Sequence, residues 1–173
     1  MTIQLRHETP HDIAAIEAVI IAAFADVPHT SHAEQYIVRA LRAAKELTRS
    51  IVAVEQGQVV GHVALSPVVI SHVHGHKTEG WYGLGPLSVL PAWQRQGIGS
   101  RLVQQALAEL ETQHAAGCVL LGEPAYYARF GFQAHAGLQL QGVPPGYFMA
   151  LAFEGSVPEG TAHYSNAFEV STP

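Results

Sequence analysis

The sequence predicts an α/β protein of the α+β kind, in which helices flank a mixed β-sheet. Two observations lead to this class. Short β-branched or apolar runs alternate with amphipathic helical stretches along the chain. Of the 173 residues, 48% are hydrophobic and 13% are charged, which is the composition of a globular protein with a packed core. No repeat or low-complexity linker divides residues 1–173, and we therefore expect one domain.

The first predicted elements are one strand and two helices. Alternation over residues 2–7 predicts the strand. Thr9 and Pro10 combine a capping hydroxyl with a proline suited to the first helical position, which predicts a helix from Pro10. Ser31 and Glu34 have the spacing of a capping box, which predicts a second helix beginning at Ser31. The apolar stripes of the two helices are Ile13, Ile16, Ile20 and Phe24, and Ile37, Leu41, Ala44 and Leu47.

The middle of the chain reads as three strands. Two runs rich in Val and Ile, 50–55 and 58–70, flank Gly57 and predict an antiparallel hairpin. The polar stretch 71–80 predicts a turn. Residues 84–90 predict the next strand, which Pro91 stops.

The second half begins with a Gly-rich turn and a long amphipathic helix ended by Gly117. A short apolar strand follows at 118–121, and we expect it to be central. A helix at 125–130 and a strand at 147–153 come next, and the tail beyond Glu154 is weakly patterned. The predicted order is β-α-α-β-β-β-α-β-α-β, with room for one more strand near the C-terminus.

Composition excludes several classes of protein. A formal charge of −5 with only nine Lys and Arg argues against nucleic-acid binding. No apolar run is long enough to span a membrane, and the first residues lack a signal peptide, so we expect a cytoplasmic protein. The lone Cys118 permits no intrachain disulfide and is expected in the core. His72, His74 and His76 would share one face of a strand, but no acid completes the set locally, and we expect no metal site.

The segment 84–99, LGPLSVLPAWQRQGIG, predicts a phosphate site because an apolar strand, a glycine-containing turn and a helix start follow one another. Glycines let ligand oxygens approach the backbone, and the free amides at a helix N-terminus receive negative charge. The donors would be the amides of residues 95–100. The segment lacks both the Gly-Lys-Ser/Thr ending of a P-loop and the full G-x-G-x-x-G of a dinucleotide fold.

Two segments resemble the GNAT superfamily of N-acetyltransferases. Residues 94–99, QRQGIG, match its Q/R-x-x-G-x-G/A signature. Residues 126–132, YYARFGF, resemble its Y-x-x-x-G-F segment, one helix and one strand later, which is the spacing of that family. The wider segment 122–132, GEPAYYARFGF, is similar to one in a bacterial group of predicted N-acetyltransferases. The resemblance covers residues 2–153 and is densest in 84–132.

The resemblance implies a mostly antiparallel sheet, splayed between its fourth and fifth strands to admit the pantetheine arm of acetyl-CoA. It implies acetyl transfer from acetyl-CoA to a primary amine, by direct attack in a ternary complex. The acceptor would be a small molecule or a peptide, and homodimers are common in the superfamily. The residues that the resemblance assigns to the cofactor are Leu87, Ser88, Val89, Arg95, Gln96, Gly97, Ile98, Gly99 and Ser100.

Tyr127 matches the family's tyrosine near the thioester sulfur, which implies a general acid for the departing thiolate of coenzyme A. The alternative is a tyrosine that only packs. Many family members carry a basic carboxylate on the strand before the loop, but residues 84–90 contain no Asp or Glu. Glu123 is the nearest candidate base, and its alternative is a solvated or helix-capping acid. Glu79 and the loop histidines are rival candidates.

His29 and His32 fall in the loop between the first two helices, which lines the acceptor side in family members, and are candidate substrate contacts. A second class of function is open beside the enzyme. The missing strand carboxylate is compatible with a non-catalytic acyl-CoA-binding sensor or interaction module. Tyr127 counts against that alternative.

Overall fold

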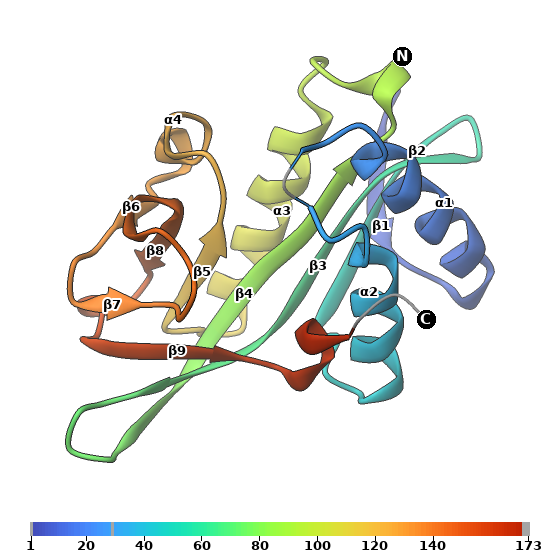
Figure 1. Cartoon of the computed structure of the whole chain (residues 1–173). Helices are drawn as coiled ribbons and strands as arrows, with labels where there is room; N and C mark the ends of the chain where they lie inside the picture. Colours follow the sequence, from blue (N-terminus) through green and yellow to red (C-terminus); the bar gives the residue numbers. More distant parts are fainter. Residues whose placement is uncertain (1, 29, 171–173) are drawn as a thin grey trace.

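The computed structural model describes residues 2–28 and 30–170, and it places helices on both faces of a twisted mixed sheet (Figure 1). The strands are β1 (Gln4–His7), β2 (Arg49–Glu55), β3 (Gln58–Ser71), β4 (Lys77–Val89), β5 (Gly117–Leu121), β6 (Gln133–Ala134), β7 (Leu138–Gln139), β8 (Phe148–Ala152) and β9 (Gly160–Tyr164). The helices are α1 (Ile13–Phe24), α2 (Glu34–Ala43), α3 (Ile98–Thr112) and α4 (Pro124–Tyr127).

The strand order is β1-β2-β3-β4-β5-β8-β6. Neighbours in this order are antiparallel except β4 and β5, which are parallel. β9 pairs with β3 over residues 68–71, beyond the last β2 partner at Leu65. The predicted fold class is therefore confirmed.

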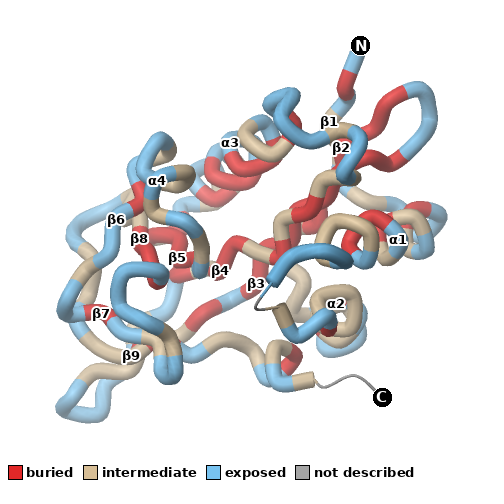
Figure 2. The backbone as a smooth tube through the Cα atoms, turned by 45° about the horizontal axis from the view of Figure 1, so that its top comes forward, coloured by how far each residue is buried: buried red, intermediate tan, exposed pale blue. Residues whose placement is uncertain are grey.

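Alternation along β2 explains why the sheet has a core on each face. Ile51 and Ala53 pack with the apolar side of α3, whereas Val52 and Val54 pack with α1 and α2. Successive side chains of a strand point to opposite faces, so one run of apolar residues serves both cores. Figure 2 shows the buried residues concentrated along the central strands and the inner face of α3.

The splay that positions the site lies between β4 and β5. Their parallel register ends at Gly83 and Val119, although β4 continues to Val89. At the same place β4 is bulged: Val63 faces Leu87 and Leu65 faces Leu84, so two β4 residues lie opposite one residue of β3. A bulge bends a strand and increases its twist, and the end of β4 therefore pairs with β3 alone. The predicted splay between the fourth and fifth strands is confirmed.

The predicted start of the second helix at Ser31 is wrong. Helix α2 begins at Glu34 with Ala33 as its N-cap. The Ser31 hydroxyl accepts from the Ala33 amide at 3.3 Å, and the Glu34 carboxylate bonds the Thr30 hydroxyl instead of completing a capping box. The helix ends at Ala43, so the end of the predicted stripe lies beyond it.

Two other boundaries differ from the prediction. β4 begins at Lys77, because the polar stretch expected to be a turn is half strand, paired with β3 as far as Ser71. α3 ends at Thr112 rather than at Gly117, because the Ala115 amide bonds the Leu110 carbonyl at 3.0 Å and breaks the helical ladder. The weakly patterned tail contains β9, which is the further strand for which the predicted order left room. The hairpin at Gly57 and the helical turn after Thr9 are as predicted.

Across the described residues, no helix is long and apolar enough to cross a membrane. The same residues contain no group of three or more His, Cys, Asp or Glu side chains placed to hold a metal ion. His72 instead stacks on His76 with ring centroids 4.1 Å apart and bonds the Thr78 hydroxyl at 2.6 Å.

Candidate functional site

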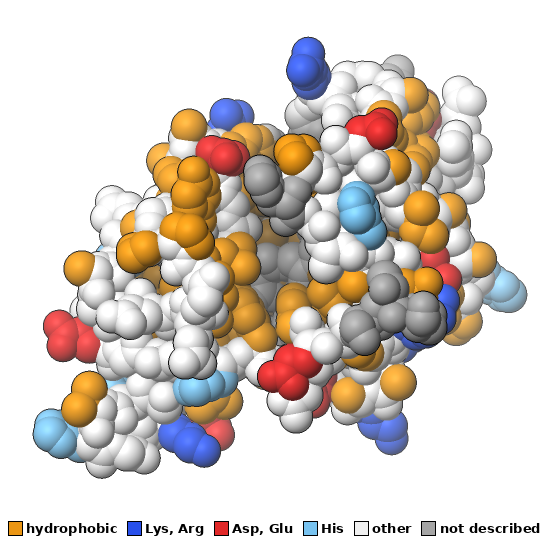
Figure 3. Space-filling model, viewed as in Figure 1, with side chains coloured by type: hydrophobic (Ala, Val, Ile, Leu, Met, Phe, Trp, Pro, Cys, Tyr) orange, Lys and Arg blue, Asp and Glu red, His pale blue; other side chains and the backbone are white. Residues whose placement is uncertain are grey.

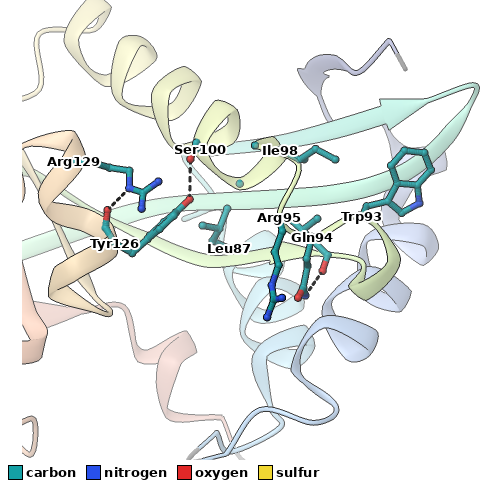
Figure 4. A pocket seen from close by; sticks show the side chains of 11 residues that line it. Leu87, Trp93, Gln94, Arg95, Ile98, Ser100, Tyr126 and Arg129 are labelled. Atoms are coloured by element: carbon teal, nitrogen blue, oxygen red, sulfur yellow. Dashed lines mark hydrogen bonds between the residues drawn. The ribbon is translucent and has the colours of Figure 1, made fainter.

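A cavity of about 510 Å³ opens where the end of β4, the start of α3 and the turn after α4 meet (Figure 4). It contains most of the residues that the sequence assigned to a phosphate ligand. The lining residues are Leu87, Val89, Trp93, Gln94, Arg95, Gly97, Ile98, Gly99, Ser100, Tyr126 and Arg129. We call this cavity the loop pocket.

The first turn of α3 supplies unpaired donors to the loop pocket. Gly97 precedes the helix with φ of +81°, a left-handed conformation that glycine adopts without strain. The first helical hydrogen bond runs from the Arg101 amide to the Gly97 carbonyl at 3.1 Å. Within the described chain, the amides of Ile98, Gly99 and Ser100 have no backbone acceptor. Such amides, at the positive end of the helix dipole, bind anions.

Side chains hold the loop before the helix in place. The Gln94 amide group donates to the Val89 carbonyl at 2.9 Å, and that of Gln96 donates to the Ala92 carbonyl at 3.3 Å. Arg95 lies between them with φ of +63° and lines the loop pocket (Figure 4). The loop therefore presents a guanidinium group beside the free amides.

Tyr126 and Arg129 also line the loop pocket, and neither was among the predicted site residues. The Tyr126 hydroxyl and the Ser100 hydroxyl are 3.2 Å apart, so α4 is joined to the start of α3. The Arg129 guanidinium lies over the Tyr126 ring, 4.5 Å from its centroid, and its Nε donates to the Tyr126 carbonyl at 2.9 Å. The signal in the sequence was the spacing of three, which puts both side chains on one side of a helical turn.

Beyond Gly83, the edge of β4 that does not pair with β3 faces the gap between β4 and β5. The Leu90 amide donates to the Val60 carbonyl of β3 at 2.9 Å. Backbone groups alternate along a strand, so Ser88 also turns its amide toward β3, and Leu87 and Val89 turn theirs toward the open side. The Ser88 side chain is buried and does not line the loop pocket. Of the three predicted strand residues, Leu87 and Val89 are thus placed for a ligand.

A second cavity, also of about 510 Å³, adjoins the first at Leu87. We call it the apolar pocket. Its lining residues are Phe24, Glu34, Ile37, Gly83, Leu84, Gly85, Pro86, Leu87, Leu121, Tyr127, Tyr164 and Phe168. Figure 3 shows hydrophobic side chains on both sides of the hollow at the centre of this face.

Tyr127 lines the apolar pocket, and aromatic neighbours fix its ring. The ring centroid lies 4.9 Å from that of Tyr126, 6.2 Å from that of Phe130 and 6.1 Å from that of Phe132. The ring also lies directly against Gly122. Burial, with smaller contributions from Tyr126 and Cys118, raises the pKa of Tyr127 to about 12. The phenol is therefore protonated at neutral pH and able to donate.

The other predicted site residues are at the surface or outside the described part. Glu123 is exposed, and its backbone carbonyl accepts from the Tyr126 and Tyr127 amides, both at 3.1 Å. His32 is exposed, and its amide donates to the Thr30 hydroxyl at 3.1 Å. Neither lines either pocket, and their assigned roles stay predictions. His29 lies outside the described residues.

Comparison with known proteins agrees with this geometry. Residues 46–134 match the model of the acetyltransferase (GNAT) domain. An uncharacterized N-acetyltransferase of Escherichia coli K12, YhbS, is 38% identical over 133 residues, which is 76% of this chain and 74% of that protein.

Two solved structures share the fold over nearly the whole chain. A GNAT family acetyltransferase from Brucella melitensis, in complex with acetyl-CoA, superposes with a TM-score of 0.85 and 48% identity, over 96% of this chain and 98% of the other. E. coli YhbS in complex with CoA superposes with a TM-score of 0.85 and 31% identity, over 97% and 92%.

Proposed function

The chain belongs to the GNAT family of acetyltransferases, and on that premise we propose that it transfers the acetyl group of acetyl-CoA to a primary amine by direct attack in a ternary complex. The observation that carries the proposal is the meeting of two pockets at Leu87, on the end of β4 that pairs with β3 but not with β5. One pocket offers donors for an anionic ligand, and the other is an apolar chamber lined by the partly buried phenol of Tyr127.

The loop pocket fits coenzyme A chemically. Its free α3 amides suit a pyrophosphate, and Arg95 and Arg129 add charge-assisted donors. The open backbone groups of Leu87 and Val89 suit the amides of a pantetheine arm in the splay. The Brucella relative, which shares this fold, was solved in complex with acetyl-CoA, and this supports the assignment of the ligand. Acetyl-CoA would supply an activated thioester.

The residues of this chain have distinct tasks in such a transfer. The adjoining pockets hold acetyl-CoA and the amine side by side, so that their reaction becomes effectively unimolecular and correctly oriented. Tyr127, kept protonated by its burial, donates its proton to the departing thiolate. An alkyl ammonium has an ordinary pKa of about 10.4, so the acceptor needs a base. Glu123 is the base that the sequence pattern proposes.

The first experiment follows release of free coenzyme A from acetyl-CoA with a panel of amines and peptides. We expect amine-dependent release by the wild-type protein and a loss of about 10²- to 10⁴-fold in Tyr127→Phe, the usual contribution of a general acid. Tyr147→Phe is the matched control, because this exposed tyrosine lines neither pocket. Undiminished release by Tyr127→Phe would remove the role of the phenol but keep the enzyme.

The second candidate is a non-catalytic acyl-CoA-binding module, favoured by the lack of any Asp or Glu in residues 84–90. It predicts tight acetyl-CoA binding with no amine-dependent release across the whole panel. Failure to bind either acetyl-CoA or coenzyme A would refute both candidates.

A further inference from the structure

Glu34, at the first residue of α2, is the one formally charged side chain among the described residues that line the apolar pocket. The other lining residues are glycine, aliphatic, proline or aromatic. The spacing of Glu34 from Ser31 predicts only a helix-capping acid. The structure places it in the same chamber as Tyr127, the proposed proton donor.

Only one of the two carboxylate oxygens of Glu34 has a hydrogen-bond partner among the described residues. Its Oε1 accepts from the Thr30 hydroxyl. Its Oε2 is shielded from solvent and has no hydrogen-bond partner among the residues described. A shielded carboxylate oxygen without a partner is costly, and a ligand that donates to it would remove that cost.

The two arginines of α2 form ion pairs with acids other than Glu34. Arg39 donates two hydrogen bonds to Glu17 of α1, both at 3.0 Å. Arg42 donates two to Glu8, at 3.0 and 2.9 Å. No ion pair involves Glu34 in the described part of the chain. Glu17 and Glu34 are the acids of α1 and α2. Glu17 is paired with Arg39, whereas Glu34, which lines the apolar pocket, has no Arg or Lys partner among the described residues.

We propose that Glu34 binds the ammonium group of the acceptor and takes its first proton, and that the acceptor is a primary amine on an apolar body. This inference rests on the transferase function proposed above. The acceptor nitrogen loses one proton to Glu34 before attack and a second as its bond to the acetyl carbon forms. The carbon–sulfur bond breaks, the thiolate takes a proton from Tyr127, and the second proton from nitrogen restores the phenol. Glu34 then releases its proton to water, which is the net proton of the reaction.

The walls of the apolar pocket specify the rest of the acceptor. Tyr164 and Phe168, from the C-terminal segment, stack with centroids 4.9 Å apart and an interplanar angle of 27°. The Tyr164 ring lies directly against Gly83 of β4, where any side chain would displace it. Phe24 and Ile37 line the same pocket from α1 and α2. Aromatic and aliphatic walls favour an aryl or alkyl amine over a polyamine or an acidic peptide.

Binding tests the inference without turnover. Calorimetry on the protein saturated with coenzyme A uses 2-phenylethylamine as the probe and 2-phenylethanol as its uncharged analogue. We expect Glu34→Gln to bind the amine about 10- to 100-fold more weakly, the usual effect of losing a hydrogen bond to a charged group. It should bind the alcohol as the wild type does. Glutamine retains the size of the side chain and an acceptor for Thr30, and unchanged coenzyme A affinity would verify the fold.

Two further variants sharpen the test. Glu111→Gln removes the same charge from an exposed residue of α3 and should bind the amine like the wild type. Glu123→Gln tests the base that the sequence pattern favoured. We expect Glu34→Gln, and not Glu123→Gln, to raise the KM for the amine and to abolish the acidic limb of kcat/KM against pH. Equal amine affinity in Glu34→Gln and wild type, or an acidic limb lost only in Glu123→Gln, would overturn the inference.

Failure of this inference can be told from failure of the transferase proposal. If the wild type acetylates polyamines or peptides but neither binds nor acetylates 2-phenylethylamine, the transferase proposal stands and the assignment of an apolar acceptor is wrong. If no amine is acetylated while 2-phenylethylamine binds in a Glu34-dependent manner, the amine site stands and the transferase proposal is wrong.

Discussion

Replacing Gly122 by alanine should slow turnover while leaving the affinity for acetyl-CoA almost unchanged. A Cβ atom at Gly122 would lie 2.6 Å from Cδ2 of Tyr127 and closer still to its Cε2. Carbon atoms in contact are ordinarily about 3.5–4.0 Å apart, so the ring must move by about 1 Å. A reacting group misplaced by about 1 Å can cost roughly 100-fold in rate. We therefore expect kcat to fall by about two orders of magnitude.

The assay is coenzyme A release under saturating substrates, beside calorimetric binding of acetyl-CoA. Gly146→Ala is the matched control, since a Cβ there meets no atom within 4 Å. The double variant Gly122→Ala/Tyr127→Phe is the sharper comparison. If the alanine acts only by displacing the phenol, the double variant will be no slower than Tyr127→Phe alone, because two changes that act through one group are not additive.

Two results would refute this reasoning. Full turnover in Gly122→Ala, with an unchanged melting temperature, would mean that the position of Tyr127 is unimportant or that the ring adapts at no cost. A double variant slowed by the product of the two single effects would mean that Gly122 acts on another part of the site. Neither Gly122 nor Tyr127 lines the loop pocket, so a large loss of acetyl-CoA affinity would also contradict the separation into two pockets.

Three other predictions follow from the same structure. Arg95→Ala should weaken acetyl-CoA binding by about 10-fold, and less at high salt, because an exposed guanidinium contact with phosphate is screened; calorimetry at two salt concentrations checks this. Buried His62, whose ring is bonded to the Ser50 hydroxyl at 2.8 Å, has its pKa lowered to about 4 by burial, so the fold disfavours the charged imidazole. The free energy of unfolding should therefore fall by about 3 kcal/mol as the pH drops from 6.5 to 4. Urea unfolding measures this pH dependence, which should be absent from His62→Gln. Gly117→Ala should destabilise the protein by about 1–3 kcal/mol, measured by urea unfolding, because its Cβ would overlap the Trp81 ring.

The loop pocket could be predicted from sequence because its parts are close together in the chain. Residues 84–100 contain the strand, the glycines and the helix start, and their physical roles depend on local backbone geometry. The short segment 126–129 returns to the same place through the Tyr126–Ser100 contact. What local pattern could not give was the direction of each backbone group, which separates Leu87 and Val89 from the buried Ser88.

The apolar pocket could not be predicted because its walls come together only through tertiary pairing. Its residues lie on α1, α2, β4, β5, α4, β9 and the turn that follows β9. The tail beyond Glu154 has too little periodicity to fix the bounds of the further strand for which the predicted order left room, and β9 is held there by pairing with β3 and β7. Glu34 matched a capping pattern in sequence, and only the fold places it in one apolar chamber with Tyr164 and Phe168. The proposed acetyl-CoA site is built from one short stretch of chain, so sequence motifs can indicate the acetyl donor. The proposed amine site is assembled from distant segments, so the acetyl acceptor has to be inferred from the packed structure.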